Sequence, residues 1–291
     1  MSSEVQATRG TTTTSTPTGF VQVLRRYPLV SYFVMAYAIS WFYVIVFEII
    51  WPLPDTIVTD VPLLFGPVVA GFVMTAVVAG RAGVKQLLRR LVLWRVSPRW
   101  YLLAFVGMPA LYLLGLALVP GAFSSVSLPL STLLLLPVFF VVLLVTGGPL
   151  LEEPGWRGFA LPRLQLRWGP LVGTLILGVL WAGWHVPQYF TPVFAATNGG
   201  LTVPGVAIFL VGAVSFSVII TWAFNHTNAS LVIAILIHQC INFSQGLTTT
   251  ILPGAKNNEV GPVFVFALAA LIIVLATRGR LGYTAPAESN P

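Results

Sequence analysis

The sequence predicts an all-α, polytopic membrane protein with about eight transmembrane helices and a polar cavity inside the membrane. Hydrophobic residues make up 57% of the 291 residues and charged residues only 8%, whereas soluble domains carry about 25% charged residues. Apolar stretches near the roughly 20 residues that cross a bilayer recur along the chain. Helices satisfy their own backbone hydrogen bonds in lipid. This composition therefore excludes a soluble globular protein.

The chain divides into two short polar ends and one long apolar body. We expect residues 1–24 to form a disordered cytoplasmic tail, residues 25–281 the transmembrane helical domain, and residues 282–291 a short C-terminal tail. The first tail is polar and contains the run Thr11–Thr14, a composition that cannot build a packed core. The apolar stretch after Arg26 is longer than the core of a cleaved signal peptide, so we interpret it as a retained first span.

Eight apolar stretches follow one another after the first tail. The expected spans cover residues 29–50, 62–80, 100–120, 129–160, 169–188, 204–224, 228–246 and 260–277. The fourth expected span differs from the others because it continues through two glutamates. Its residues Gly147, Gly148, Pro149 and Pro154 are helix breakers, so we expect this helix to be kinked or interrupted.

Basic residues gather in the segments that connect these spans on one side. With eight spans, nearly all Lys and Arg residues share that side, and only Lys256 falls on the other. Cytoplasmic loops carry an excess of Lys and Arg, so we expect a multi-pass plasma-membrane protein with both termini in the cytoplasm. The net charge of +7 is explained by this topology, and no nucleic-acid partner is expected. The single cysteine, Cys240, excludes an intrachain disulfide.

The basic segment 81–99 supports two interpretations. Its basic residues alternate with Leu, Val and Trp at helical spacing, which is typical of an amphipathic helix on an anionic membrane leaflet. A simple loop that sets the topology explains the same charges.

Two adjacent glutamates, Glu152 and Glu153, lie within the apolar body of the chain. Ionisable residues at membrane depth are costly and usually functional. If the segment is helical, Glu153 and Arg157 are four residues apart and can pair. Glu152 then points about 100° away and is available for chemistry. A charged turn at a helix end remains the alternative.

Three further polar residues are expected at a similar depth, in a cavity open to the cytoplasm: His185, His238 and Asn242. The spacing of four puts His238 and Asn242 on one helical face. Each histidine alone is typical of an interhelical packing residue. Together with a carboxylate pair, however, they supply a base, an orienting group and hydrogen-bond donors.

Two mechanisms fit these residues. Glu152, assisted by His185, would act as general base on a water that attacks a carbonyl, while His238 and Asn242 would donate to the developing oxyanion. Alternatively, Glu152, His185 and His238 would hold a divalent metal such as zinc. The sequence contains no HExxH motif, so the metal remains open and no cofactor is assigned.

The same residues resemble four motifs of a known family, the CAAX prenyl protease and bacteriocin-processing (CPBP, or Abi) intramembrane endopeptidases. The motifs lie within about residues 150–245 and appear as Glu152-Glu153-Pro-Gly-Trp-Arg157, Trp181-Ala-Gly-Trp-His185, Phe224-Asn225-His226-Thr227 with Ser230, and His238-Gln-Cys-Ile-Asn242. In the second motif the family usually has Phe where this chain has Trp181.

The resemblance implies an eight-helix intramembrane endopeptidase of the glutamic or metallo type. It implies that Glu152 is the base, that Glu153 pairs with Arg157, that His185 assists, and that His238 and Asn242 form the oxyanion hole. The implied partners are the lipid bilayer and a membrane-embedded or lipidated peptide substrate. A non-enzymatic immunity or scaffold protein is the alternative function. A transporter is a third, although the sequence shows no internal repeat.

Overall fold

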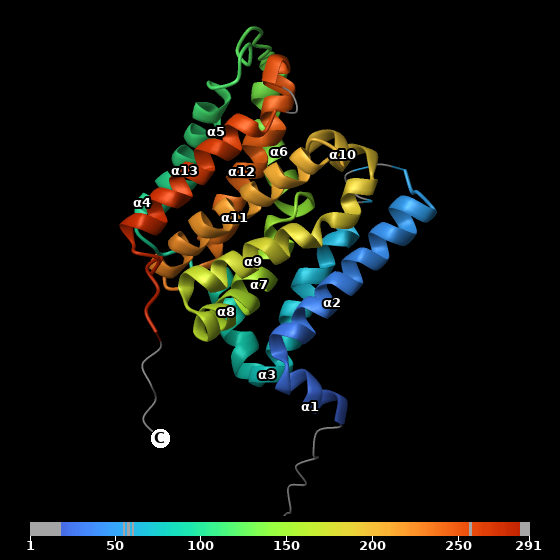
Figure 1. The fold of residues 1–291 in the computed structure, drawn as a ribbon, viewed down its shortest axis with the longest axis vertical. Helices are drawn as coiled ribbons and strands as arrows, with labels where there is room; N and C mark the ends of the chain where they lie inside the picture. The colour runs from blue at the N-terminus through green and yellow to red at the C-terminus, as the bar shows by residue number, and fades with distance from the viewer. Residues whose placement is uncertain (1–18, 55, 57–58, 60, 256–257, 286–291) are drawn as a thin grey trace, which may run out of the picture.

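Helices and short turns make up the part of the chain that the structure describes. The computed structural model describes residues 19–54, 56, 59, 61–255 and 258–285, which contain no β-strand. The helices, drawn in Figure 1, are α1 (Gly19–Arg26), α2 (Pro28–Tyr43), η1 (Val44–Ile50), η2 (Val61–Leu64), α3 (Phe65–Leu91), α4 (Pro98–Leu102), η3 (Leu103–Gly107), α5 (Met108–Leu116), α6 (Leu130–Thr146), α7 (Pro149–Gly155), η4 (Trp156–Ala160), α8 (Leu161–Trp168), α9 (Pro170–Trp184), η5 (Val186–Phe190), α10 (Pro192–Thr197), α11 (Val203–His226), α12 (Leu231–Ile251), η6 (Pro253–Ala255) and α13 (Val260–Ala276).

Seven helical stretches among the described residues are long and apolar enough to cross a membrane, judged by length and composition. They cover Pro28–Ile50, Val61–Leu91, Pro98–Leu116, Leu130–Trp168, Pro170–Phe190, Val203–His226 and Leu231–Thr248. The eighth expected span corresponds to α13, which is apolar but has only 17 residues. The prediction of an all-α polytopic membrane protein is therefore confirmed.

The fourth span is interrupted, as its glycines and prolines predict. Between α6 and α7, Gly148 has a φ of +98°, a left-handed conformation that glycine adopts without strain. Pro149 then begins α7, where its missing N–H costs nothing. Pro154 cannot donate a hydrogen bond within α7, and η4, which follows directly, is a π-helix. Such π-turns are rare and occur frequently at functional sites.

The two ends of the chain lie only partly within the described residues. Helix α1 begins at Gly19, whereas the composition predicts a disordered tail up to residue 24. The helix is tied down because it contacts α3 and Arg25 Nε donates to the Val77 carbonyl at 2.9 Å. Residues 1–18, Lys256 and residues 286–291 lie outside the described residues.

The basic segment 81–99 is helical over its first part. Helix α3 continues past Gly80, whose φ of +58° kinks it, and ends at Leu91. The expectation of a helix is thus confirmed for residues 81–91, and a turn leads from there to α4. The Ser230 hydroxyl donates to the Leu93 carbonyl at 2.6 Å, which holds this turn against the start of α12.

The segment that carries the glutamates lies in the interior of the bundle (Figure 1). Helix α7 packs against α3 and α12, and η4 packs against α3, α8 and α9. Glycines permit this approach: a Cβ on Gly71 would lie 2.9 Å from the Cα of Gly155, and one on Gly155 would lie 2.7 Å from the carbonyl carbon of Pro67. Backbone contact between α3 and α7 therefore fixes the position of the acidic pair.

Candidate active site

Glu152 is held by two indole N–H groups from different parts of the fold. Its Oε2 atom accepts a hydrogen bond from Trp181 Nε1 at 2.7 Å and from Trp156 Nε1 at 3.1 Å. Its Oε1 atom lies against Gly148, where any Cβ would collide with it. The side chain is only 3% exposed. One carboxylate oxygen is thus fixed by two donors, and the other lies beside the helix break.

Glu153 is the centre of a second, fully buried network. Its Oε1 atom accepts from Arg157 Nη1 at 2.8 Å, with both side chains 0% exposed. The same oxygen is 2.8 Å from His238 Nδ1, and Arg157 Nη2 donates to the Ser217 hydroxyl at 3.2 Å. The network therefore joins η4 and α7 to α11 and α12. The pair between Glu153 and Arg157 that the four-residue spacing predicts is formed.

The contact with Glu153 orients the His238 ring. Because a carboxylate can only accept, the His238 proton in this bond lies on Nδ1. The Nε2 atom is then directed away from Glu153, with no hydrogen bond to a described residue. His238 can donate through Nε2 only when both of its ring nitrogens carry a proton.

Trp181 brings both histidines to the glutamates. Its ring lies edge-on to His238, with centroids 5.1 Å apart, and to His185, with centroids 5.9 Å apart. The Arg157 guanidinium lies 4.8 Å from the ring centroid of Trp181, a distance typical of a cation–π contact. One indole thus contacts Glu152, Arg157 and both histidines.

His185 has a defined tautomer. Its Nδ1 atom is 2.8 Å from the Trp181 carbonyl, which can only accept, so Nδ1 carries the proton. The lone pair of a neutral ring is then on Nε2, which leaves this nitrogen able to accept a proton. Among the described residues His185 makes no direct hydrogen bond to Glu152, and Trp181 connects the two.

Asn242 lies at the helix break. Its Nδ2 atom donates to the carbonyl of Gly147 at 2.9 Å, a backbone group that the interruption of the helix has released. An amide nitrogen has two protons, so one remains for another acceptor. Asn242 therefore joins α12 to the end of α6 beside Glu152.

The expected polar cavity is a closely packed polar cluster in this structure. Glu152, Glu153, Arg157 and His238 are each at most 3% exposed. Among the described residues, no group of three His, Cys, Asp or Glu side chains is placed so that it could hold a metal ion, and this includes the metal candidates from the sequence, Glu152, His185 and His238. Their role as metal ligands stays a prediction.

Several contacts of this site were not predicted from the sequence. The Trp156 and Trp181 indoles were assigned no hydrogen bond to Glu152, because a tryptophan in an apolar span usually indicates packing. Ser217 was not singled out, although a hydroxyl within the apolar stretch 204–224 marks a point where a polar partner is needed. The catalytic roles of the six expected residues remain predictions.

Comparison with known proteins extends over the part of the chain that carries this site. Residues 133–244 match the family described as type II CAAX prenyl endopeptidase, Rce1-like. A protein named CAAX prenyl protease 2, from Methanococcus maripaludis, is 32% identical over 139 residues. That alignment covers 47% of this chain and 49% of the relative, so the match spans about half of the relative's length. The resemblance seen in the four motifs is confirmed: residues 133–244 are similar to the Rce1-like type II CAAX prenyl endopeptidases.

Proposed function

We propose that this protein is an intramembrane endopeptidase that hydrolyses a peptide bond of a lipidated or membrane-embedded substrate, with Glu152 as the general base. The observation that carries the proposal is the unequal environment of the two glutamates. Glu153 is neutralised by Arg157, whereas Glu152 is held by neutral indole donors on one oxygen. A carboxylate that is oriented but not neutralised is suited to take a proton from water.

The chemistry then follows from the positions of the donors. Glu152 Oε1 takes a proton from water, and the resulting hydroxide attacks the scissile carbonyl carbon. The oxyanion that develops would be stabilised by His238 through Nε2 and by the second proton of Asn242 Nδ2. The proton held by Glu152 would then pass, with His185 Nε2 as a relay, to the nitrogen of the departing amine as the C–N bond breaks, which restores both side chains. Glu153 and Arg157 position His238 and stay unchanged.

The substrate class is suggested by the family and by the setting. Membrane helices surround the site, so a substrate must be anchored in or span the lipid. The relative's name specifies a CAAX prenyl protease, and such C-terminal motifs are prenylated on their cysteine. We therefore propose a peptide with a prenylated cysteine next to the scissile bond as the first substrate to test.

The direct test uses the purified full chain in proteoliposomes. A farnesylated fluorogenic peptide that ends in a CAAX sequence is expected to be cut on the carboxyl side of the modified cysteine, and mass spectrometry identifies both products. The same peptide without the farnesyl group should be cut much more slowly, because it does not partition into the bilayer. Absence of cleavage in both, with a correctly inserted protein, would contradict the proposal and favour the scaffold alternative.

Trp181→Phe is expected to lower kcat about tenfold or more and to leave KM nearly unchanged. The substitution removes the shorter of the two indole hydrogen bonds to Glu152. A hydrogen bond to a charged group contributes about 1.5–3 kcal/mol, and a loss of about 1.36 kcal/mol in transition-state stabilisation lowers the rate tenfold. The measurement is steady-state cleavage, with kcat and KM determined separately.

Trp184→Phe is the matched control for this prediction. Trp184 lies on the same helix α9, is 1% exposed, and its Nε1 atom has no hydrogen-bond partner among the described residues. Removing its indole therefore takes away similar volume but no bond to Glu152. Equal kinetic effects of the two variants would show that Trp181 acts through packing alone.

A further inference from the structure

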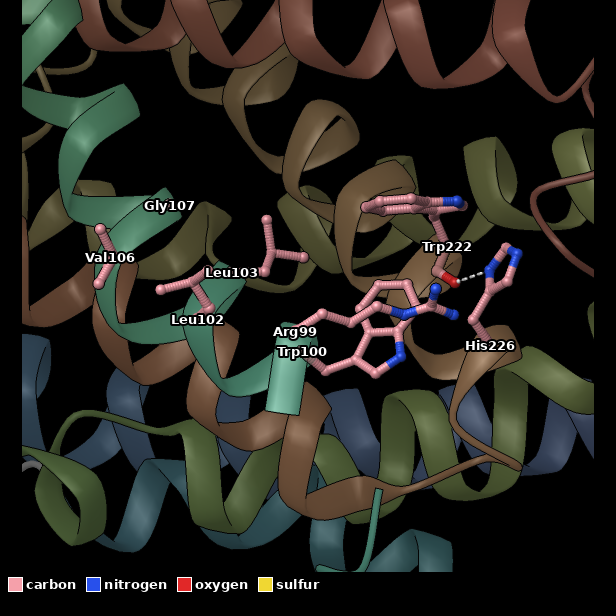
Figure 2. Close-up of a pocket in the computed structure, with 8 residues that line it drawn as sticks. All are labelled: Arg99, Trp100, Leu102, Leu103, Val106, Gly107, Trp222 and His226. Carbon is pink, nitrogen blue, oxygen red and sulfur yellow. Dashed lines mark hydrogen bonds between the residues drawn. The ribbon is translucent and has the colours of Figure 1, made fainter. Parts of the chain in front are cut away.

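A pocket of about 590 Å³ lies on the outside of the bundle, away from the glutamates. It forms where α4 and η3 pass the end of α11, and its lining residues are Arg99, Trp100, Leu102, Leu103, Val106, Gly107, Trp222 and His226 (Figure 2). None of these residues contacts Glu152 or Glu153 through a hydrogen bond or ion pair. The pocket is thus a separate feature from the candidate active site.

The two ends of this pocket have different chemistry. Figure 2 shows Arg99, the two tryptophans and His226 gathered at one end, and Leu102, Leu103, Val106 and Gly107 at the other. Trp100 lies edge-on to Trp222 with centroids 5.0 Å apart, and the Arg99 guanidinium lies 5.1 Å from the Trp100 centroid. The residues from Arg99 to Gly107 follow one helical stretch, about 12 Å at 1.5 Å per residue. The pocket is therefore polarised along the helix axis.

The polar end lies where further basic residues come together. Asn225 donates to the Leu281 carbonyl at 2.9 Å, which holds the turn after α13, with exposed Arg278 and Arg280, against the end of α11. The Ser230–Leu93 hydrogen bond brings in the turn that carries Arg95. Arg95, Arg278 and Arg280 therefore lie on segments that are held at the same end of α11 as the polar end of the pocket.

None of the carboxylates among the described residues lines this pocket. Glu259 precedes α13 and so lies at the opposite end of that helix from Arg278 and Arg280, and Glu48 lies in η1, after α2. Glu152 and Glu153 are buried in the interior. The positive end of the pocket is thus not neutralised by a described side chain, and it suits an anionic group.

We propose that this pocket binds one anionic phospholipid, with its phosphate at Arg99 and an acyl chain along Leu103, Val106 and Gly107. An arginine fork matches a phosphate geometrically, tryptophans favour the level of the lipid headgroups, and basic pockets at helix ends bind anionic headgroups. Zwitterionic lipids fit the apolar end equally well, so the charge at Arg99 confers selectivity for the anionic headgroup. This site is independent of the proposed peptidase activity.

The experiment is native mass spectrometry of the full chain, delipidated in detergent and titrated with phosphatidylglycerol or phosphatidylcholine with identical acyl chains. We expect phosphatidylglycerol to bind at least fivefold more tightly at one site. Arg99→Gln should reduce this preference to near unity and leave phosphatidylcholine binding unchanged. Val106→Trp, which fills the apolar end, should weaken binding of both lipids.

Arg167→Gln is the matched control. Arg167 is also exposed and also stacks on the tryptophan that follows it, 4.6 Å from the Trp168 centroid, but it does not line the pocket. It should keep the preference for phosphatidylglycerol. Equal binding of both lipids by the wild type, or an equal loss in Arg99→Gln and Arg167→Gln, would overturn the proposal.

Two competition measurements identify the class of ligand that the pocket binds. Glycerol 3-phosphate at the same concentrations should not compete with phosphatidylglycerol, because it lacks the acyl chain; competition would assign a soluble phosphate compound instead. A farnesylated peptide should not displace the lipid either, and displacement would make the pocket part of the substrate path. Both readouts are binding measurements, so they stand whether or not peptide cleavage is observed.

Discussion

Glu152→Gln is expected to lower kcat for cleavage of the lipidated peptide by about 10²–10⁴-fold, the range that general acid–base catalysis contributes. Glutamine has the same shape, and its carbonyl oxygen can accept both the Trp156 and the Trp181 hydrogen bonds. What it cannot do is take a proton from water. The variant should therefore insert and fold as the wild type does, and only the chemical step should be lost.

The measurement is single-turnover cleavage in proteoliposomes, together with thermal unfolding to show that the fold is intact. Glu259→Gln is the matched control, because Glu259 binds Tyr112 at 3.0 Å and lies apart from the cluster. Burial raises the pKa of Glu259, so a neutral side chain there should change activity little. Full activity of Glu152→Gln would exclude this residue as the base. A cellular function that survives the substitution would favour the scaffold alternative.

Arg157→Met is expected to destabilise the fold by about 3–5 kcal/mol, the cost of removing one partner from a buried ion pair. Both Arg157 and Glu153 are fully buried, so the substitution leaves the Glu153 carboxylate with His238 as its remaining partner. The hydrogen bond to Ser217 and the packing against Trp181 are lost as well. Reversible unfolding in mixed detergent micelles measures this loss.

A double variant separates stability from function in this network. In Glu153→Leu/Arg157→Met both charges are gone, and replacing a whole buried pair by apolar residues is often neutral or stabilising. We expect it to regain most of the stability lost in Arg157→Met but to remain inactive, because His238 then has no carboxylate to orient it. If the double variant were active, Glu153 would have no role in positioning His238.

Local features of this protein were predictable from the sequence because they depend on near neighbours. The spans follow from the length of the apolar stretches, and the interruption of the fourth follows from Gly148 and Pro149. The contact between Glu153 and Arg157 follows from helical spacing alone. The start of α1 was missed, because its stability comes from the contact of Arg25 with Val77 in another helix.

Contacts between distant helices were not predictable in the same way. His238 lies 85 positions from Glu153, and nothing in either local sequence indicates that Nδ1 contacts that carboxylate. Asn242 was assigned to an oxyanion, yet it also binds the Gly147 carbonyl. The indole bonds to Glu152 depend on how α9 packs beside α7, which composition and periodicity do not specify.

The interruption between α6 and α7 has a mechanical consequence. Helix α6 has no fully buried residue and packs on the core through partly buried side chains such as Phe140 and Leu144, whereas most of α7, beyond the glycine pair, is buried. Two side-chain amides of α12 donate hydrogen bonds to backbone carbonyls in and directly after α6. Gln239 Nε2 donates to the Phe140 carbonyl, and Asn242 Nδ2 donates to the Gly147 carbonyl. We therefore expect that a tilt of α6 about Gly148 towards the lipid would break these two amide hydrogen bonds, while the charged cluster beside Glu152 stays in place.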